Sequence, residues 1–193
     1  MGYLAHTSCY LVGPIEDDPS FGRDWRSVAT EMLDEMQVKY FNPLDRPDYF
    51  AKIEPNVPPA LSREEILQQA RFGAPPAQRR LIRSQEFIRR ICLRFVNTCD
   101  FVICYLPNAK TFGTTEELSV ASKAEKPIMF ICPDGTPSLW IFDMAQNQII
   151  RHTLSDVIQY LKQIDSGKVD LNPIQWFFIK NYPRFKMESR YDW

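Results

Sequence analysis

The sequence contains few of the residues on which common cofactor-binding motifs depend. Only seven of its 193 residues are glycine, only two are histidine, and its five cysteines form no Cys-x-x-Cys pair. The glycine-rich loops that bind dinucleotides and triphosphates are absent. So are the Gly-x-Ser-x-Gly nucleophile elbow and the usual zinc-ligand spacings. These absences argue against nucleotide binding by a glycine cradle and predict a protein that uses no cofactor and no metal.

Long apolar runs and a strong charge of either sign are also missing. No run approaches the roughly 20 apolar residues of a membrane span, and the net charge of −1 gives no general attraction to nucleic acid or acidic membranes. The N-terminal residues lack the basic start and apolar run of a signal peptide. The odd number of cysteines, mostly in apolar segments, is typical of buried, reduced thiols. We therefore expect a cytoplasmic protein with neither polymeric nucleic acid nor a membrane as its partner.

What is present is an alternation of strands and helices. Apolar runs predict strands at 8–12, 38–41, 101–106, 127–132 and 147–150. Apolar residues three and four positions apart predict helices over 24–37, 79–96, about 115–124 and around 157–164. On the first of these helices the predicted apolar face comprises Trp25, Val28, Ala29, Met32, Leu33 and Met36. The pattern predicts a single α/β domain over residues 1–193, a flavodoxin/Rossmann-like open parallel sheet of about five strands with helices on both faces.

Two segments depart from this alternation. Residues 46–78 contain six prolines, which prevent long regular elements, and we interpret the segment as an insertion over one edge of the core. Residues 172–193 form an aromatic C-terminal tail. Packing or an interface between copies of the chain, in a homodimer or higher homo-oligomer, explains the tail better than base stacking does, because aromatic residues dominate such surfaces.

The segment Gly113-Thr114-Thr115-Glu116-Glu117-Leu118 joins the third predicted strand to the next helix. Ligands of open α/β sheets bind at the carboxyl ends of the strands. A glutamate at this place can act as a fixed, ionised nucleophile. The same residues also fit a capping box, in which Thr114 and Glu117 satisfy each other's backbone donors. The two interpretations are compatible, and the segment by itself does not decide between them.

Arginines mark one face of the helix over 79–96. Arg79, Arg83, Arg90 and Arg94 share this face, and Glu86 is spaced to pair with Arg83 or Arg90, as on a solvated surface. Alternatively, the start of this helix lies near the carboxyl edge of the sheet. Arg79 and Arg83 would then bind a phosphate, since guanidinium groups match phosphate geometry. The second interpretation predicts a nucleotide substrate.

Six segments together resemble one protein family. In order they are Cys9-Tyr10-Leu11-Val12-Gly13-Pro14-Ile15, Asp24-Trp25-Arg26, Asn42-Pro43-Leu44-Asp45, Asp100-Phe101-Val102-Ile103, Gly113-Thr114-Thr115-Glu116-Glu117-Leu118 and Lys126-Pro127-Ile128. Their order and spacing resemble the nucleoside 2-deoxyribosyltransferase family, which includes nucleotide N-glycoside hydrolases, and most of all its short phage and bacterial branch. The resemblance covers roughly residues 10–133 without the insertion.

The resemblance implies an active site that breaks and re-forms an N-glycosidic bond. Glu117, and not Glu116, matches the family's nucleophile, and Tyr10 matches the tyrosine that orients it. The substrate-binding residues would be Gly13, Pro14 and Ile15, which line the sugar pocket, together with Gly113 and Thr114. The implied substrate is a (deoxy)nucleoside or its 5′-monophosphate. Its sugar passes through a covalent intermediate on Glu117 to a second base or, in a hydrolase, to water.

The sequence departs from the family at two acidic positions. Thr111 replaces the aspartate that handles the leaving base, and Cys92 replaces an acidic residue before the third strand. Base recognition would then fall to Asn108, Asp45 or Glu86, and Tyr191 is the candidate for the family's closing tyrosine. These departures keep two alternatives open, a hydrolase that releases free base and a non-catalytic nucleotide-binding sensor. Partner binding through the aromatic tail is a third.

Overall fold

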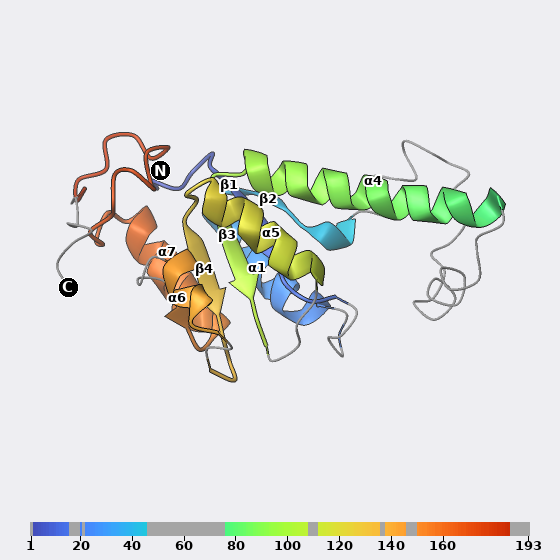
Figure 1. Ribbon diagram of the computed structural model, residues 1–193. Coiled ribbons are helices and arrows are strands. Elements are labelled where there is room, and N and C mark those ends of the chain that lie inside the picture. Colours follow the sequence, from blue (N-terminus) through green and yellow to red (C-terminus); the bar gives the residue numbers. More distant parts are fainter. Residues whose placement is uncertain are drawn as a thin grey trace.

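Five parallel strands form the centre of the molecule (Figure 1). The structure, a computed structural model, describes residues 2–15, 20, 22–45, 76–107, 112–135, 138–145 and 150–185, without the side chains of 76–85 and 142. The strands are β1 (Ser8–Val12), β2 (Lys39–Phe41), β3 (Phe101–Tyr105), β4 (Ile128–Ile131) and β5 (Ile150–Arg151). Their order is β2-β1-β3-β4-β5, and every pair is parallel. This is the flavodoxin-like order, so the predicted fold class is confirmed.

Helices cover both faces of the sheet, as predicted. The helices α1 (Arg23–Glu35) and α7 (Leu154–Asp165) pack on one face. The helices α4 (Pro76–Thr98), α5 (Phe112–Lys123) and α6 (Trp140–Met144) lie on the other. A short 3-10 helix over Pro43–Asp45 follows β2. Because successive side chains of a strand point to opposite faces, Cys9 and Leu11 of β1 face α1, while Tyr10 and Val12 face α4 and α5.

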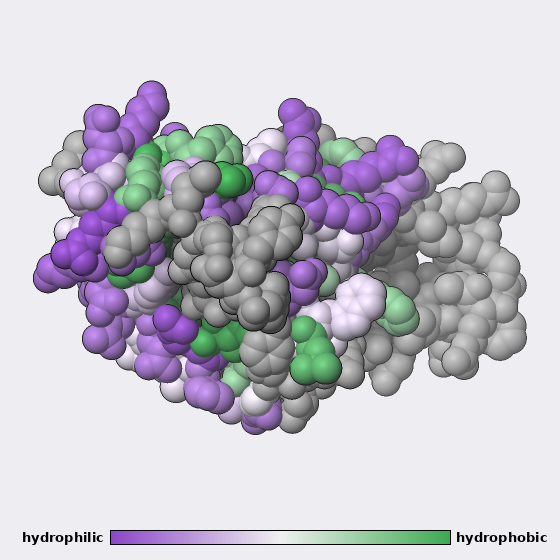
Figure 2. Space-filling view, turned by 60° about the vertical axis from the view of Figure 1, so that its left-hand side comes forward, coloured by the Kyte–Doolittle hydropathy of each residue, from purple (hydrophilic) through white to green (hydrophobic). Residues whose placement is uncertain are grey.

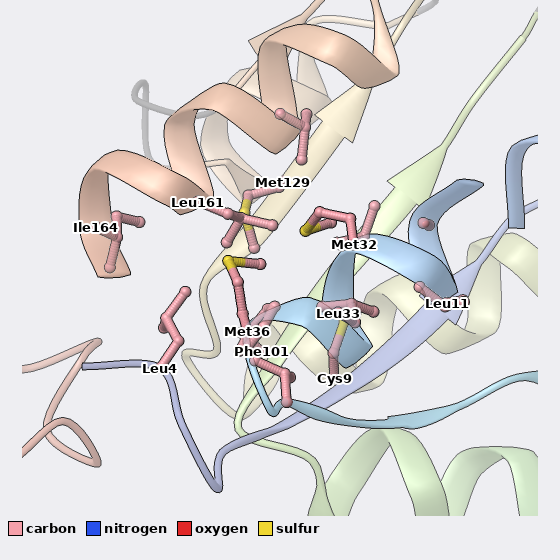
Figure 3. Close-up of a cluster of buried hydrophobic side chains, with 14 of the residues drawn as sticks. Leu4, Cys9, Leu11, Met32, Leu33, Met36, Phe101, Met129, Leu161 and Ile164 are labelled. Atoms are coloured by element: carbon pink, nitrogen blue, oxygen red, sulfur yellow. The ribbon is translucent and has the colours of Figure 1, made fainter. Parts of the chain in front are cut away.

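The core on the α1 and α7 face is almost wholly apolar (Figure 3). Met32 and Leu33 of α1, and Met36 just after it, meet Leu161 and Ile164 of α7 over the sheet. On the strands beneath them lie fully buried side chains, namely Cys9, Leu11, Phe101 and Met129. Strands buried on both sides form near-continuous apolar runs. This is why β1, β3 and β4 were readily predicted from the sequence.

Three helices end in the same way, by a left-handed residue that reverses the chain. Gln37, Glu125 and Gly167 have φ of 58°, 52° and 71°. The next residue in each case donates its N–H to a carbonyl five residues earlier, at 2.9, 3.1 and 2.9 Å. This Schellman geometry satisfies carbonyls at the helix terminus. It ends α1 at Glu35, whereas the sequence predicted a helix through Gln37.

Other boundaries also differ from the predictions. The helix α4 begins at Pro76, three residues earlier than predicted, because proline is well suited to the first helical turn. The five-residue α6 was not predicted, since it is too short to show a helical period. On α1, Val28 is 48% exposed, and the charged residue Arg26 takes a buried place instead. The bulk of the predicted insertion, residues 46–75, lies outside the described residues.

The described part of the aromatic tail packs against the core. Trp176 and Tyr182 are buried beside Phe101 and Tyr3, and Phe177 is exposed. The last eight residues, among them Tyr191, lie outside the described residues. On the coloured surface of Figure 2, apolar residues form small, separate groups among hydrophilic ones. Packing against the core therefore accounts for Trp176 and Tyr182, and not for Phe177. Within the described ranges, no helix combines the length and apolar character needed to cross a bilayer.

Candidate active site

A tyrosine of β1 and a glutamate of α5 meet on the face of the sheet that α4 and α5 cover. The hydroxyl of Tyr10 donates a hydrogen bond of 2.7 Å to Oε1 of Glu117, across 107 positions of sequence. Tyr10 is fully buried and Glu117 is half-buried. A short bond to a carboxylate oxygen fixes the direction in which that oxygen points. The structure thus joins two residues that the family resemblance singled out.

The surrounding elements explain this meeting. The sheet order makes β1 and β3 neighbours, while the chain leaves β1 for α1 on one face and leaves β3 for α5 on the other. Ligands of open α/β sheets bind at such a switch point. Tyr10 faces α5 because of strand alternation, and Glu117 lies one and a half turns into that helix. The pair therefore occupies the place where this topology provides a ligand site.

The capping-box interpretation of the same segment is wrong. The helix α5 begins at Phe112, so Thr114 is its third residue and Glu117 its sixth, and Thr114 is 4% exposed. A capping residue must precede the first helical residue, whereas Thr114 lies inside α5. A capping box does occur at the start of α7, where Thr153 and Asp156 exchange hydrogen bonds of 3.1 and 3.2 Å.

Glu116 and Glu117 have different partners. Both Nε and Nη2 of Arg89 on α4 donate to the Glu116 carboxylate, which holds the pKa of Glu116 below its usual value. This ion pair lies on the surface, where Arg89 and Glu116 are 56% and 35% exposed. Successive residues of a helix point about 100° apart. Glu116 is thus turned toward α4 and Glu117 toward Tyr10, so the two adjacent carboxylates are not interchangeable.

The environment of Tyr10 keeps its hydroxyl protonated. Burial raises the pKa of Tyr10 well above its usual value, and the neighbouring Glu117 carboxylate and Cys92 thiol raise it further. The phenol therefore remains a hydrogen-bond donor over the physiological range. Cys92 stands where the family resemblance expects an acidic residue. It lies in the same buried cluster as Tyr10 and forms a side-chain hydrogen bond with it. Cys104 of β3 is also near, because Glu117 contributes to raising the pKa of its buried thiol.

The turn after β1 is tightly packed. A Cβ added to Gly13 would lie 2.8 Å from the carbonyl oxygen of Tyr105 and 3.0 Å from Trp25, so no larger residue fits without displacement. Trp25 in turn stacks on Tyr105 at a centroid distance of 5.5 Å. Pro14 is buried and Ile15 is partly exposed. The turn is therefore held against the end of β3.

The other predicted site residues are more scattered. Asp45 is exposed after β2, and its side chain accepts a weak bond from Asn42 at 3.4 Å. Glu86 forms a surface ion pair with Arg90, one of the two partners predicted for it. Gly113 is exposed, and a Cβ there would meet nothing within 4 Å. Asn108 lies outside the described residues.

The two arginines predicted to bind phosphate lie far along α4. Their backbones precede Arg89, which contacts α5, by ten and six residues, or about 15 and 9 Å along the helix axis. Figure 1 shows this half of α4 extending beyond the sheet. The side chains of Arg79 and Arg83 lie outside the described residues, so phosphate binding by them stays a prediction.

Sequence reasoning missed one buried residue that contacts the turn after β1, Arg26. Its guanidinium is 1% exposed and donates to the carbonyl oxygens of Gly13 and Gly22, each at 2.9 Å. A signal was present, since Arg26 precedes Ala29 and Leu33 by three and seven positions on the buried stripe of α1. In the part of the chain that the structure describes, no three potential metal ligands gather.

Comparisons with known proteins give structural matches only. No protein-family model matches the chain, and no curated protein matches it in sequence. A 2-deoxyribosyltransferase from Bacillus psychrosaccharolyticus aligns with a TM-score of 0.51 and 18% identity, over 80% of this chain and 92% of its own. A 2-desoxiribosyltransferase from Leishmania mexicana aligns with a TM-score of 0.51 and 13% identity, over 80% and 96%. The chain therefore has the fold of the 2-deoxyribosyltransferases.

Proposed function

We propose that this protein is an N-glycosidic-bond enzyme that acts on a (deoxy)nucleoside or its 5′-monophosphate, with Glu117 as the nucleophile. The observation that carries the proposal is the 2.7 Å hydrogen bond from Tyr10 to Glu117 at the switch point of the sheet. Two structures of the same fold are those of 2-deoxyribosyltransferases, which supports this class of reaction. Transfer of the sugar to a second base is the favoured reaction.

In the first half-reaction an oxygen of Glu117 attacks C1′ of the sugar. A new C1′–O bond forms as the C1′–N bond breaks, and the electron pair of the broken bond leaves with the base, which takes up a proton from solvent water. The transition state resembles an oxocarbenium ion, as in retaining glycosidases. The Tyr10 bond holds the carboxylate in one orientation, and a well-aligned nucleophile lowers the entropic part of the barrier.

In the second half-reaction the glycosyl–Glu117 ester is cleaved by an acceptor. A nitrogen of a second base attacks C1′, loses its proton, and returns the electron pair of the ester bond to Glu117. If water attacks instead, the products are the free sugar and the free base. The hydrolase is a second candidate because Cys92, which takes the place of an acidic residue, contacts Tyr10 with a thiol. That thiol is a weaker polar partner for an acceptor base than a carboxylate.

The test is a comparison of Glu117→Gln with Glu116→Gln. Each variant is incubated with nucleosides and nucleoside monophosphates, with and without an acceptor base, and the products are separated by chromatography. Glu117→Gln retains the size of the side chain but removes the nucleophile, so release and exchange should fall on the order of 10³-fold or more. Glu116→Gln should stay within about threefold of the unmodified protein, because Glu116 faces Arg89.

The outcomes separate the alternatives. Exchanged nucleoside identifies a transferase, and free base without an acceptor identifies a hydrolase. Mass spectrometry of rapidly quenched protein should find a sugar adduct on the peptide that contains Glu117. Full activity of Glu117→Gln, or equal losses in both variants, would refute Glu117 as the nucleophile. Calorimetric binding of a nucleotide with no release of base would instead indicate the non-catalytic sensor.

A further inference from the structure

The buried arginine of α1 has an unusual set of partners. Arg26 is 1% exposed, and its guanidinium lies 4.4 Å from the centroid of the Trp25 ring. Its Nη2 donates to the carbonyl oxygen of Gly13 at 2.9 Å, and its Nη1 donates to those of Gly22 and Pro14 at 2.9 and 3.4 Å. A charged side chain is costly to bury. Hydrogen bonds from a buried guanidinium to backbone carbonyls restrict the conformation of that backbone.

Gly22 is shaped to admit this guanidinium. It has a left-handed φ of 69°, and a Cβ added to it would lie 2.0 Å from Nη1 of Arg26 and 2.7 Å from the carbonyl oxygen of Pro14. Any other residue would therefore displace the arginine as well as strain the backbone. The start of α1 and the turn after β1 are thus joined through Arg26. The contact therefore requires both the arginine at position 26 and the glycine at position 22.

The contact also sets the direction of a backbone donor. In a planar trans peptide the C=O and the N–H point to opposite sides. Because the carbonyl of Pro14 is directed at Arg26, the N–H of Ile15 is directed away from the guanidinium. Pro14 has no N–H of its own, so this is the first amide donor after Gly13. It follows the carboxyl end of β1, the strand that contains Tyr10.

Arg26 and Glu117 have one neighbour in common, the buried thiol of Cys104. The pKa of the Cys104 thiol, raised by burial, is also raised by Glu117 and is lowered by Arg26. Both charges therefore act on the same thiol at the end of β3. The guanidinium thus binds the turn that follows β1, one of the two strands at the switch point on which the proposed function rests.

We propose that Arg26 is a positioning residue, which holds the Gly13–Pro14 turn so that the N–H of Ile15 donates to an oxygen of the substrate's sugar. This inference rests on the proposed function only for the identity of the ligand. The geometric part, that the guanidinium fork fixes the turn, concerns the protein alone. The two parts require separate measurements.

The variants are Arg26→Lys, which retains the charge but loses the fork, Arg26→Gln, which loses both, and Gly22→Ala, which displaces the guanidinium. Arg23→Lys is the matched control, since Arg23 is exposed on the same helix. In base-release assays Arg26→Lys and Arg26→Gln should raise KM at least tenfold and change kcat by less than threefold. A purely structural role would lower the active fraction, and thus the apparent kcat, with KM unchanged. A KM within twofold of the unmodified protein in both variants would overturn the inference.

Backbone mobility without ligand tests the clamp independently of activity. The ¹⁵N order parameter of Ile15 should fall from about 0.85, a rigid backbone, to below about 0.6 in Arg26→Lys and in Gly22→Ala, while the order parameters of β1 and those of Arg23→Lys remain as they were. An unchanged order parameter at Ile15 would overturn the clamp itself. Greater mobility in a protein that never releases base would support the clamp and refute the proposed function.

Discussion

Replacing Tyr10 by phenylalanine removes one oxygen atom from a fully buried side chain and leaves its ring in the core. The atom removed is the donor of the 2.7 Å bond to Glu117. A hydrogen bond to a charged group contributes about 1.5–3 kcal/mol. If that energy serves to hold the nucleophile for attack, its loss raises the barrier by a similar amount. Since each 1.36 kcal/mol is a factor of ten, kcat should fall by about 10- to 150-fold.

Stability should change much less than activity in this variant. Glu117 is half-buried and can accept water in place of the tyrosine. The free energy of unfolding should therefore stay within about 1.5 kcal/mol of that of the unmodified protein. Urea titration measures this quantity, and the chromatographic assay measures kcat and KM on the same preparation.

Tyr40→Phe is the matched control for Tyr10→Phe. The hydroxyl of Tyr40, on the neighbouring strand β2, also donates to a carboxylate, that of Asp34 at 3.4 Å, but on the surface. This variant should retain kcat within about twofold, as expected for a weak exposed bond. If Tyr10→Phe retains full kcat, or if both variants lose equally, the role assigned to the Tyr10 hydroxyl is refuted.

Three further predictions concern the turn, the core and alkaline pH. Gly13→Ala should lower the unfolding free energy by about 1–3 kcal/mol in urea titration, because its Cβ meets the carbonyl oxygen of Tyr105; an unchanged midpoint would contradict this. Leu33→Ala in the core should lower the free energy of unfolding by about 2–5 kcal/mol. Val28→Ala, on the exposed side of the same helix, should lower it by less than about 0.5 kcal/mol. Equal losses would show that the core is misassigned. Burial raises the pKa of Cys99 to about 12, so the folded state keeps a proton that the unfolded chain loses above about pH 8.5. The stability that this thiol contributes is complete below that pH and falls by about 1.4 kcal/mol per pH unit up to about pH 12. In urea titrations from pH 8 to 10.5, the free energy of unfolding should decline less steeply for Cys99→Ala than for the unmodified protein. An identical decline would refute the assignment.

Much of the fold could be predicted because strand and helix patterns are local. Residues 8–12 and 101–106 are continuous apolar runs since β1 and β3 are buried on both sides. The ends of helices were less predictable. Gln37 stops α1 by adopting a left-handed conformation, which is uncommon for glutamine and depends on the reversal of the chain toward β2. The start of α5 at Phe112 was missed for a related reason, since the Thr114–Glu117 spacing imitates a capping signal.

The site shows the same division between local pattern and tertiary contact. The sequence by itself determined the alternating strands and helices and, through resemblance, selected Tyr10 and Glu117. Only the tertiary structure brought those residues into contact across 107 positions and turned Glu116 toward Arg89. It also buried Arg26, which the predicted apolar face did not include, and left Val28, which that face did include, 48% exposed. Hydropathy gives the period of a helix, but the carbonyls that a buried charge requires come from another segment, and only folding brings that segment near.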